Sequence, residues 1–450
     1  MILVAMAALA GLLSAKEPSP CIRGLCGAES LAPYFAALSN SRGPGARAVH
    51  ILELGDSHSA GDSITGPWRD ILQARFGSAG RGVLPPGRPF DGFIPHGVHV
   101  EQSPGWSVEN IYRAPATAPA TATAYGVSGF RLTSRTAGAQ ISLTAEPVQA
   151  FRRLTVCADA EAGTGAYVMS VGQVRMRVQI DGSSSGVQCE SLIADTAQVQ
   201  ASVQVDSGTV TLTSWASFAD AGGVAVSNLG VVGAELRHFA RNDDHAVRQE
   251  FDAYRPDLIV LEFGTNDGFV GRFDAGAFES RLREQIARLQ RLSGGAPILV
   301  IGAPDAETTR PELTGNAAAN TAANCAKKPV QKAAVIGKSS TSKKPASRKS
   351  SARSKKKPAP KAVVAKTWFS PPALAQVRAI QRRVTREMDV AFWDWGARMG
   401  GPGAADEWAT ANPPLMRADR VHTTTAGGAK VAAMLQADLD EAFTLYQASR

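Results

Sequence analysis

Three mainly apolar runs in this sequence each end at a glycine. The runs cover residues 49–54, 258–263 and 297–301, and the glycines are Gly55, Gly264 and Gly302. A continuous apolar run is typical of a strand buried on both faces, as in a parallel sheet covered by helices. Helical spacing of apolar residues follows the first two runs, over 59–76 and 275–293. Alternating strands and helices predict an α/β fold with a mostly parallel sheet and three layers, α/β/α.

The segment between the first run and the second has a different pattern. From about residue 95 to 226 the sequence contains short alternating runs rich in Thr, Val and Ser, such as 139–144 and 203–205. Turn signals such as Asp181-Gly182 separate these runs. Short alternating strands divided by turns predict an all-β sandwich. We therefore expect a second domain inserted into the α/β domain.

The length of the chain agrees with this division. The chain has 450 residues. Setting aside roughly 20 N-terminal residues, roughly 130 of β insert and roughly 55 of polar loop leaves about 245, which suits one α/β domain. Hydrophobic residues make up 44% of the chain and charged residues 20%, which fits a folded protein rather than a disordered one. No run approaches the length of a membrane span inside the chain, which excludes a polytopic membrane protein.

The positive charge of the chain is concentrated in one tract. Residues 327–366 hold 12 Lys and 2 Arg with no Asp or Glu, whereas the whole chain has a formal net charge of +8. The rest of the chain is therefore mildly acidic, and the pattern does not indicate a nucleic-acid-binding domain. The tract is rich in Lys, Ser, Ala and Pro, so we expect 313–366 to be a disordered loop. The tract has two alternative roles: it is a plain spacer, or it makes a weak electrostatic contact with anionic envelope polymers.

The N-terminus and the cysteines favour export. Residues 1–13 are apolar and precede Leu13-Ser14-Ala15, which resembles the end of a secretory signal, although no Lys or Arg comes first. We expect a signal peptide or an N-terminal anchor over 1–20, and a periplasmic or secreted protein. Cys21 could pair with Cys26 and Cys157 with Cys189, but spacing alone does not fix the pairing.

Polar residues with catalytic potential follow the predicted strands. The segments are Gly55-Asp56-Ser57-His58-Ser59, Gly264-Thr265-Asn266-Asp267 and Asp419-Arg420-Val421-His422. In open parallel sheets, ligands bind beyond the carboxyl ends of the strands. We therefore expect these three segments to meet at one edge of the sheet.

Together the three segments contain the parts of a serine hydrolase. A serine hydroxyl needs an adjacent base, which His422 can be for Ser57, while Asp419 can hold the other ring nitrogen and fix the tautomer. The N–H of Ser57, at a strand-to-helix turn, and the amide of Asn266 can donate to a developing oxyanion. Gly233 allows a third N–H to approach closely.

The four blocks around Ser57, Gly233, Asn266 and His422 resemble those of the SGNH/GDSL hydrolases, in the family's order. The resemblance implies a flavodoxin-like α/β/α fold and an esterase with Ser57 as nucleophile, His422 as base and Asp419 as orienting residue. It implies an oxyanion hole formed by the N–H groups of Ser57 and Gly233 and the amide of Asn266. Asp56 and Asp267 would support the turns.

A longer resemblance narrows the class. The segments 55–62 and 73–80 are similar to those of periplasmic peptidoglycan O-acetylesterases of Gram-negative bacteria, which also carry a β-sandwich resembling a carbohydrate-binding module between the first two blocks. The expected hydrolase domain is then divided over 21–94, 227–312 and 367–450, with the sandwich over 95–226. The basic tract has no counterpart in this resemblance.

The leading hypothesis is a serine esterase that removes O-acetyl groups from a cell-envelope polysaccharide. Peptidoglycan is the substrate that the resemblance favours most. An esterase or lipase for small acyl esters, or for another acetylated polysaccharide, is the alternative among enzymes. An alternative of another class is a polysaccharide-binding protein with an idle triad. We expect no cofactor, no metal and no nucleic-acid partner, and His96 and His99 have no Cys or carboxylate at metal spacing. His58 is ascribed to packing or to the pocket wall. Trp106 and Tyr112 are ascribed to core packing, with stacking on sugar rings as the alternative.

Overall fold

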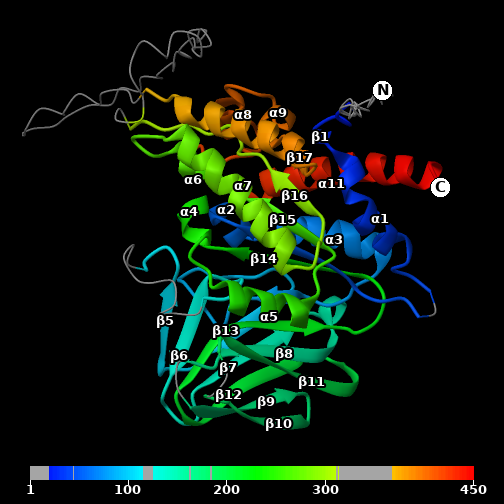
Figure 1. The fold of residues 1–450 in the computed structure, drawn as a ribbon, viewed down its shortest axis with the longest axis vertical. Coiled ribbons are helices and arrows are strands. Elements are labelled where there is room, and N and C mark those ends of the chain that lie inside the picture. The colour runs from blue at the N-terminus through cyan, green and yellow to red at the C-terminus, as the bar shows by residue number, and fades with distance from the viewer. Residues whose placement is uncertain are drawn as a thin grey trace, which may run out of the picture.

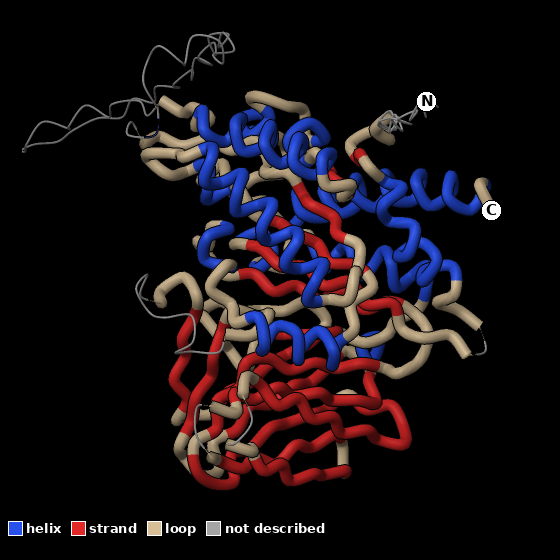
Figure 2. Tube along the Cα trace, viewed as in Figure 1, coloured by secondary structure: helices blue, strands red, loops and turns tan. Residues whose placement is uncertain are grey.

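The computed structural model describes residues 20–43, 45–114, 125–161, 164–182, 185–310, 313 and 367–450. The expected signal or anchor over 1–20 and the loop over 313–366 lie almost wholly outside this part of the chain. Within the described residues no helix is long and apolar enough to cross a bilayer. Helices and a central sheet fill one half of the molecule, and antiparallel strands fill the other (Figures 1 and 2).

The central sheet has six strands in the order β1-β17-β16-β15-β2-β14. These strands are β1 (Leu25–Cys26), β2 (Val49–Gly55), β14 (Val224–Gly230), β15 (Leu258–Glu262), β16 (Ile298–Ile301) and β17 (Ala391–Trp393). All pairs are parallel except β1 with β17. Counted along the chain, the parallel strands lie in the order second, first, third, fourth, fifth. In this doubly wound order the ligand site lies where the order reverses, between β2 and β15.

Helices cover both faces of this sheet. One face packs against α5 (Asp244–Tyr254), α7 (Ala275–Leu292) and α8 (Pro372–Glu387). The opposite face packs against α1 (Ala32–Ser39), α3 (Thr65–Phe76), α10 (Ala404–Thr410) and α11 (Thr425–Ala448). Because alternate residues of each strand face opposite layers, β2 is buried along its whole length. Its mainly apolar sequence, with His50 and Glu53 as the polar exceptions, reflects this double burial.

The remaining helices are single turns or short segments, most of them at the strand ends. They are η1 (Ala28–Leu31), α2 (Ser57–Ala60), η2 (Pro147–Gln149), α4 (Leu236–Phe239), α6 (Thr265–Gly268) and α9 (Trp395–Arg398). The helix predicted over 59–76 is wrong in one respect, because the chain breaks between α2 and α3. Asp62 there has φ 48° and turns a buried carboxylate toward Arg69 and Arg81, at 3.2 and 3.0 Å.

The segment between β2 and β14 forms two antiparallel sheets. One has the order β10-β9-β12-β7-β4, and the other has β11-β8-β13-β6-β5 with β3 also paired to β13. The strands are β3 (Gly82–Leu84), β4 (Val98–Gln102), β5 (Trp106–Asn110), β6 (Phe130–Ser134), β7 (Gln140–Ala145), β8 (Phe151–Asp159), β9 (Gly165–Val171), β10 (Val174–Gln179), β11 (Val187–Gln198), β12 (Gln200–Gly208) and β13 (Val210–Phe218). Their facing side chains share one apolar core.

The second of these sheets also packs against the α/β part. β13 is buried on both faces, because Trp215 lies in the core between the sheets whereas Ala216 and Phe218 join the core beneath α5. Two strands differ from the predicted boundaries. β14 begins at Val224, before residue 226, and belongs to the central sheet, and β3 belongs to the antiparallel sheet although it precedes residue 95. A short apolar strand carries no sequence signal for the sheet it joins.

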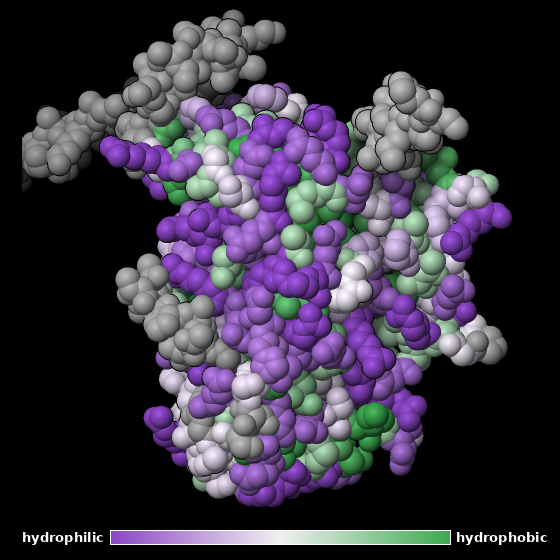
Figure 3. All heavy atoms as spheres, in the orientation of Figure 1, coloured by the Kyte–Doolittle hydropathy of each residue, from purple (hydrophilic) through white to green (hydrophobic). Residues whose placement is uncertain are grey.

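Two disulfides connect cysteines that the sequence pairs. Cys21 is bonded to Cys26, and Cys157 on β8 is bonded to Cys189, its neighbour on β11. The face of the molecule in Figure 3 is mainly hydrophilic, with only scattered apolar residues. Large apolar patches usually mark interfaces, and this face has no such patch among its described residues.

Candidate functional site

The three predicted catalytic residues form one continuous hydrogen-bonded chain. The Oγ of Ser57 lies 2.9 Å from Nε2 of His422, and Nδ1 of His422 lies 2.8 Å from Oδ2 of Asp419. Ser57 is the first residue of α2, directly after β2, and His422 lies in the loop before α11. The carboxylate can accept only from a protonated Nδ1, which leaves Nε2 free to take the proton of the serine hydroxyl.

Asp419 is held in place by its own loop. Its Oδ1 accepts the backbone N–H groups of Val421 and His422, each at 3.0 Å. Partial burial would raise the pKa of Asp419, but the hydrogen bonds from the His422 ring and from these two N–H groups outweigh it and hold the pKa well below its usual range. Asp419 is therefore ionised wherever His422 could act as a base.

Two of the predicted oxyanion donors are backbone N–H groups, those of Ser57 and Gly233. The N–H of Ser57, as the first helical N–H, has no partner within its helix. Gly233 has φ 81°, and the turn that contains it is closed by the N–H of Ala234 donating to Val231 O at 2.9 Å, so the Gly233 N–H is not part of that bond. The positive φ explains the glycine.

Asn266 is brought to the site, but its amide is already engaged. Its Nδ2 donates to Oδ2 of Asp56 and to the carbonyl of Ala234, each at 3.0 Å. These bonds tie the block after β2, the turn of Gly233 and the block after β15 together. An NH₂ group has two hydrogens, so Asn266 contributes to an oxyanion only if one of these bonds is shared or exchanged.

The two supporting aspartates are buried and have defined partners. Asp56 caps α2 and is fully buried; its Oδ1 accepts the N–H of His58 at 2.9 Å. Asp267 accepts the N–H of Leu236 at 3.2 Å, and burial raises the pKa of Asp267 to about 7. Both residues connect neighbouring blocks of the site rather than facing Ser57.

The sequence did not single out a buried acidic group beneath the triad. Glu53 on β2 and Glu262 on β15 are both buried, and Ser59 donates to Glu262 at 3.0 Å. Burial raises the pKa of Glu53 to about 7 and that of Glu262 well above its usual range. A glutamate inside an otherwise apolar strand was the signal that could have indicated this group.

Among the described residues one group has the spacing of metal ligands. Ligand atoms of Asp56, His58 and Glu262 lie within 4.8 Å of one another. Both ring nitrogens of His58, however, face acceptors of the protein: Asp56 Oδ1 at 3.2 Å and the carbonyl of Val421 at 3.0 Å. A nitrogen that donates a proton has no lone pair for a metal, so the group is satisfied internally.

An aromatic side chain lies against the turn that contains Gly233. The ring of Tyr112 covers Gly233, where an added Cβ would lie 3.4 Å from it, and packs beside the ring of His238. Tyr112 is 45% exposed, so the predicted packing role leaves much of its ring facing solvent. The next residue, Arg113, lines a pocket of about 670 Å³.

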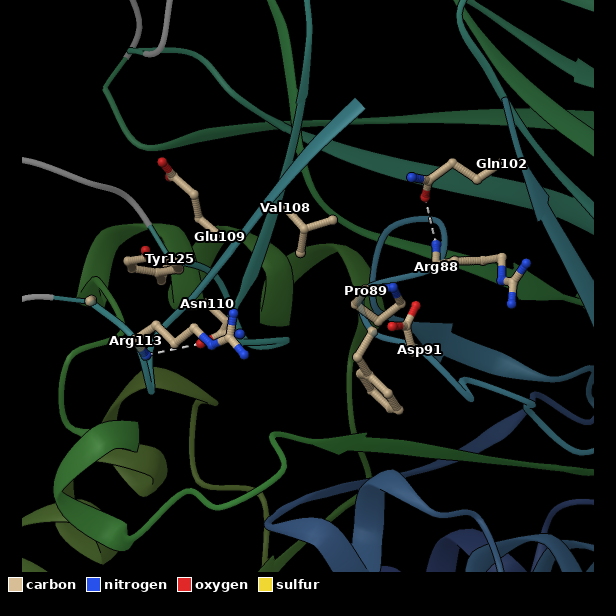
Figure 4. A pocket seen from close by; sticks show the side chains of 11 residues that line it. Arg88, Pro89, Asp91, Gln102, Val108, Glu109, Asn110, Arg113 and Tyr125 are labelled. Atoms are coloured by element: carbon tan, nitrogen blue, oxygen red, sulfur yellow. Dashed lines mark hydrogen bonds between the residues drawn. The ribbon is translucent and has the colours of Figure 1, made fainter. Parts of the chain in front are cut away.

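This pocket has a mixed polar and aromatic wall (Figure 4). Its lining residues are Arg88, Pro89, Phe90, Asp91, Gln102, Val108, Glu109, Asn110, Arg113, Ala114 and Tyr125. In Figure 4 the side chains of Glu109, Arg113 and Tyr125 come from β5 and the chain near it, across from Arg88 and Asp91. Such a wall suits a ligand with many hydroxyl groups.

Comparison with known proteins finds a family match over part of the chain. Residues 196–336 match the model of the GDSL-like lipase/acylhydrolase family, a range that contains Gly233 and Asn266. The chain carries a GDSL-like acylhydrolase domain. It is therefore a carboxylic ester hydrolase. Among curated protein sequences, none matches this acylhydrolase.

Solved structures include a protein with a similar fold. A peptidoglycan O-acetylesterase is 21% identical with a TM-score of 0.65, and the match covers 92% of this chain and 96% of that chain. A family two carbohydrate esterase from Cellvibrio japonicus is 12% identical with a TM-score of 0.27, covering 77% of this chain and 98% of that chain. The first likeness extends over the acylhydrolase domain and both antiparallel sheets.

Proposed function

We propose that this acylhydrolase is a serine O-acetylesterase that deacetylates a cell-envelope polysaccharide, with peptidoglycan as the first candidate. The observation that carries the proposal is the unbroken chain from Ser57 through His422 to Asp419 at the switch point of the sheet. The choice of substrate is supported by the fold shared, over nearly the whole chain, with a protein described as a peptidoglycan O-acetylesterase.

The proposed reaction has two halves, acetylation of Ser57 and hydrolysis of the acetyl-serine, and the base, the orienting residue and the oxyanion donors have the same roles in both. Ser57 Oγ attacks the acetyl carbonyl while His422 Nε2 takes its proton, and Asp419 stabilises the imidazolium. The tetrahedral oxyanion accepts from the N–H groups of Ser57 and Gly233 and from Asn266, whose Nδ2 then shares or exchanges its bond to Asp56 or Ala234. His422 then gives the proton to the departing sugar hydroxyl. Water repeats the sequence on the acetyl-serine and releases acetate.

The contribution of Asn266 can be measured directly. Asn266→Ala is expected to lower kcat for 4-nitrophenyl acetate by about 10²-fold to 10³-fold, because one donor to the transition state is lost. Asp267→Asn, next to it on α6, is the matched control and is expected to stay within about threefold, since an amide oxygen still accepts from Leu236. An equal loss in both variants would mean that Asn266 only holds the loop.

We further propose that the two antiparallel sheets form an inserted β-sandwich, carbohydrate-binding in character, and that a glycan chain binds from Tyr112 into the neighbouring pocket. Tyr112 supports this because its exposed ring lies directly over Gly233, beside the proposed oxyanion site. The flat face of an aromatic ring suits the apolar face of a sugar. The proposal also places the protein in the periplasm or outside the cell. It further includes a contact of residues 327–366 with anionic polymers.

The role of Tyr112 predicts a difference between two substrates. Tyr112→Ala is expected to raise KM for O-acetylated polysaccharide by about two- to tenfold, as a lost aromatic contact is worth about 0.5–1.5 kcal/mol. KM for 4-nitrophenyl acetate is expected to change less, because that ester has no neighbouring sugar. Tyr112→Phe, which keeps the ring, is the control. Equal effects on both substrates would contradict a glycan contact.

Acetate release tests the substrate proposal. The enzyme is incubated with O-acetylated peptidoglycan, with the same peptidoglycan after mild base treatment, and with acetylated xylan. The proposal expects acetate from the first, none from the second and much less from the third. Faster release from xylan, or activity on 4-nitrophenyl acetate alone, would reject peptidoglycan as the substrate while leaving the esterase assignment intact.

A further inference from the structure

His58, the residue after the proposed nucleophile, has an unusual set of partners. Its side chain is 3% exposed and lies in α2, with its ring 5.4 Å from the ring of His422, centre to centre. Its Nδ1 lies 3.2 Å from Oδ1 of Asp56, and its Nε2 lies 3.0 Å from the carbonyl of Val421. Neither ring nitrogen faces a donor in these contacts.

These partners determine the protonation of the ring. A carbonyl oxygen only accepts, so Nε2 carries a proton. Asp56 accepts the backbone N–H of His58 on Oδ1 and the amide of Asn266 on Oδ2, as an ionised carboxylate does, so Nδ1 carries a proton as well. A ring with protons on both nitrogens is an imidazolium.

A second buried histidine provides the contrast. His50 on β2 pairs Nδ1 with the carbonyl of Tyr254 at 3.0 Å and Nε2 with the hydroxyl of Ser227 at 2.7 Å. Ser227 already accepts the N–H of Val83, so its own hydrogen can go to Nε2, and His50 is satisfied as a neutral ring. The two histidines are equally buried and differ in their partners.

The groups around His58 accommodate a positive charge. Asp56 lies before α2, Glu262 lies at the end of β15 with Oε1 3.7 Å from Nδ1, and Trp395 of α9 packs edge-on at 5.0 Å. Burial alone would lower the pKa of His58, but the hydrogen bond and charge of Asp56, with Glu262 and the Val421 carbonyl, raise it to about 9. Asp56 is the nearer carboxylate, with Oδ1 at 3.2 Å from Nδ1, and is therefore the counter-ion of His58.

We propose that His58 is a positioning residue: a buried imidazolium whose Nε2–H holds the carbonyl of Val421, the residue before His422, and whose charge keeps His422 unprotonated. The Val421 bond fixes the loop that carries both His422 and Asp419. The charge disfavours a second cation in the neighbouring ring, so His422 stays a base to lower pH. This inference rests on the proposed triad but on no particular polysaccharide.

Two variants separate the two effects. His58→Gln keeps an N–H donor for Val421 but has no charge, whereas His58→Leu has neither. With 4-nitrophenyl acetate, both are expected to move the acid limb of the kcat/KM profile upward by about one pH unit, because a positive charge beside His422 is removed. Only His58→Leu is expected to lose a further tenfold or so in kcat, as the loop is no longer held.

The control variant is His96→Gln, since His96 is half-exposed and paired with Asp70 at 3.0 Å, away from His422. Its acid limb is expected to stay in place. A limb that does not move in a folded His58→Gln enzyme would overturn the proposal. So would activity that is lost with a chelator and restored by Zn²⁺ bound to His58, because a ring nitrogen that binds a metal carries no proton and the ring is then no imidazolium.

The wild-type protein allows a test that does not depend on the folding of any variant. In ¹H–¹⁵N spectra of the ring nitrogens at pH 7, His58 is expected to show two protonated nitrogens and His50 one. An unprotonated nitrogen on His58 would overturn the proposal. If the enzyme hydrolyses 4-nitrophenyl acetate but not acetylated peptidoglycan, the substrate proposal fails and this one is still tested. If the wild type hydrolyses neither substrate, the proposed triad is wrong, and both proposals fail with it.

Discussion

Replacing Ser57 by alanine is expected to lower kcat for 4-nitrophenyl acetate by at least about 10⁴-fold, to a residual rate set by binding and by the oxyanion donors. The reason is that the Oγ of Ser57 is the atom 2.9 Å from His422 Nε2, and alanine leaves that base with no nucleophile to activate. Because Ser57 makes no other side-chain bond described for the site, the free energy of unfolding should change little. Steady-state rates and thermal unfolding measure the two quantities.

Ser63→Ala is the matched control for this variant. Ser63 is six residues further along the chain, and its hydroxyl lies 3.1 Å from Oγ1 of Thr423, next to His422. It therefore disturbs the same loop without touching the proposed nucleophile, and we expect kcat within about threefold of the wild type. Retained activity in Ser57→Ala, or an equal loss in Ser63→Ala, would rule out Ser57 as the nucleophile.

Replacing Asp419 by asparagine is expected to lower kcat by about 10³-fold to 10⁴-fold. An asparagine can offer its NH₂ group to Nδ1 of His422, which favours the wrong tautomer and leaves Nε2 protonated. The negative charge that stabilises the imidazolium is lost at the same time. KM for 4-nitrophenyl acetate should change much less than kcat, which steady-state kinetics on purified protein would show.

Asp406→Asn, in α10, controls for the loss of a carboxylate that contacts the loop of Asp419. Asp406 and Asp419 are about equally exposed, at 49% and 48% of their side chains, and Asp406 pairs with Arg420 rather than with His422. We expect Asp406→Asn to keep kcat within about threefold. If the two variants lose activity equally, the loop depends on its charges and not on a hydrogen bond to His422.

The sequence predicted best those elements whose pattern has one physical cause. Strands β2, β15 and β16 are buried on both faces, so their apolar runs are continuous and their ends were placed within a residue or two. β14 is equally buried, but its short run adjoins the alternating β segment and was divided between two predicted domains. The break between α2 and α3 was missed because it depends on Asp62 meeting Arg81 from a distant part of the chain.

The site likewise has features that the sequence predicted and features that it did not. Ser57, His422 and Asp419 were found because each chemical role limits the residue type, and the structure brings them together as expected. The engagement of Asn266 with Asp56 and Ala234 could not be predicted, because it depends on a contact between three strand ends. His58 was left between a pocket and a packing role for the same reason: its partners at 262 and 421 are remote in sequence.

The pairing of Thr308 with Phe369 has a consequence for how this chain can be altered. Two backbone hydrogen bonds, of 2.9 and 3.0 Å, join these residues on either side of the long basic tract. Beside them, the Arg420 guanidinium lies over the Trp368 ring at 4.5 Å and pairs with Glu307. Because Thr308 and Phe369 already meet, the described fold fixes where the segment between them begins and ends. We therefore expect that the residues between Thr308 and Phe369 can be replaced by another sequence. The loop that carries His422 would keep the contacts of Arg420 with Trp368 and Glu307.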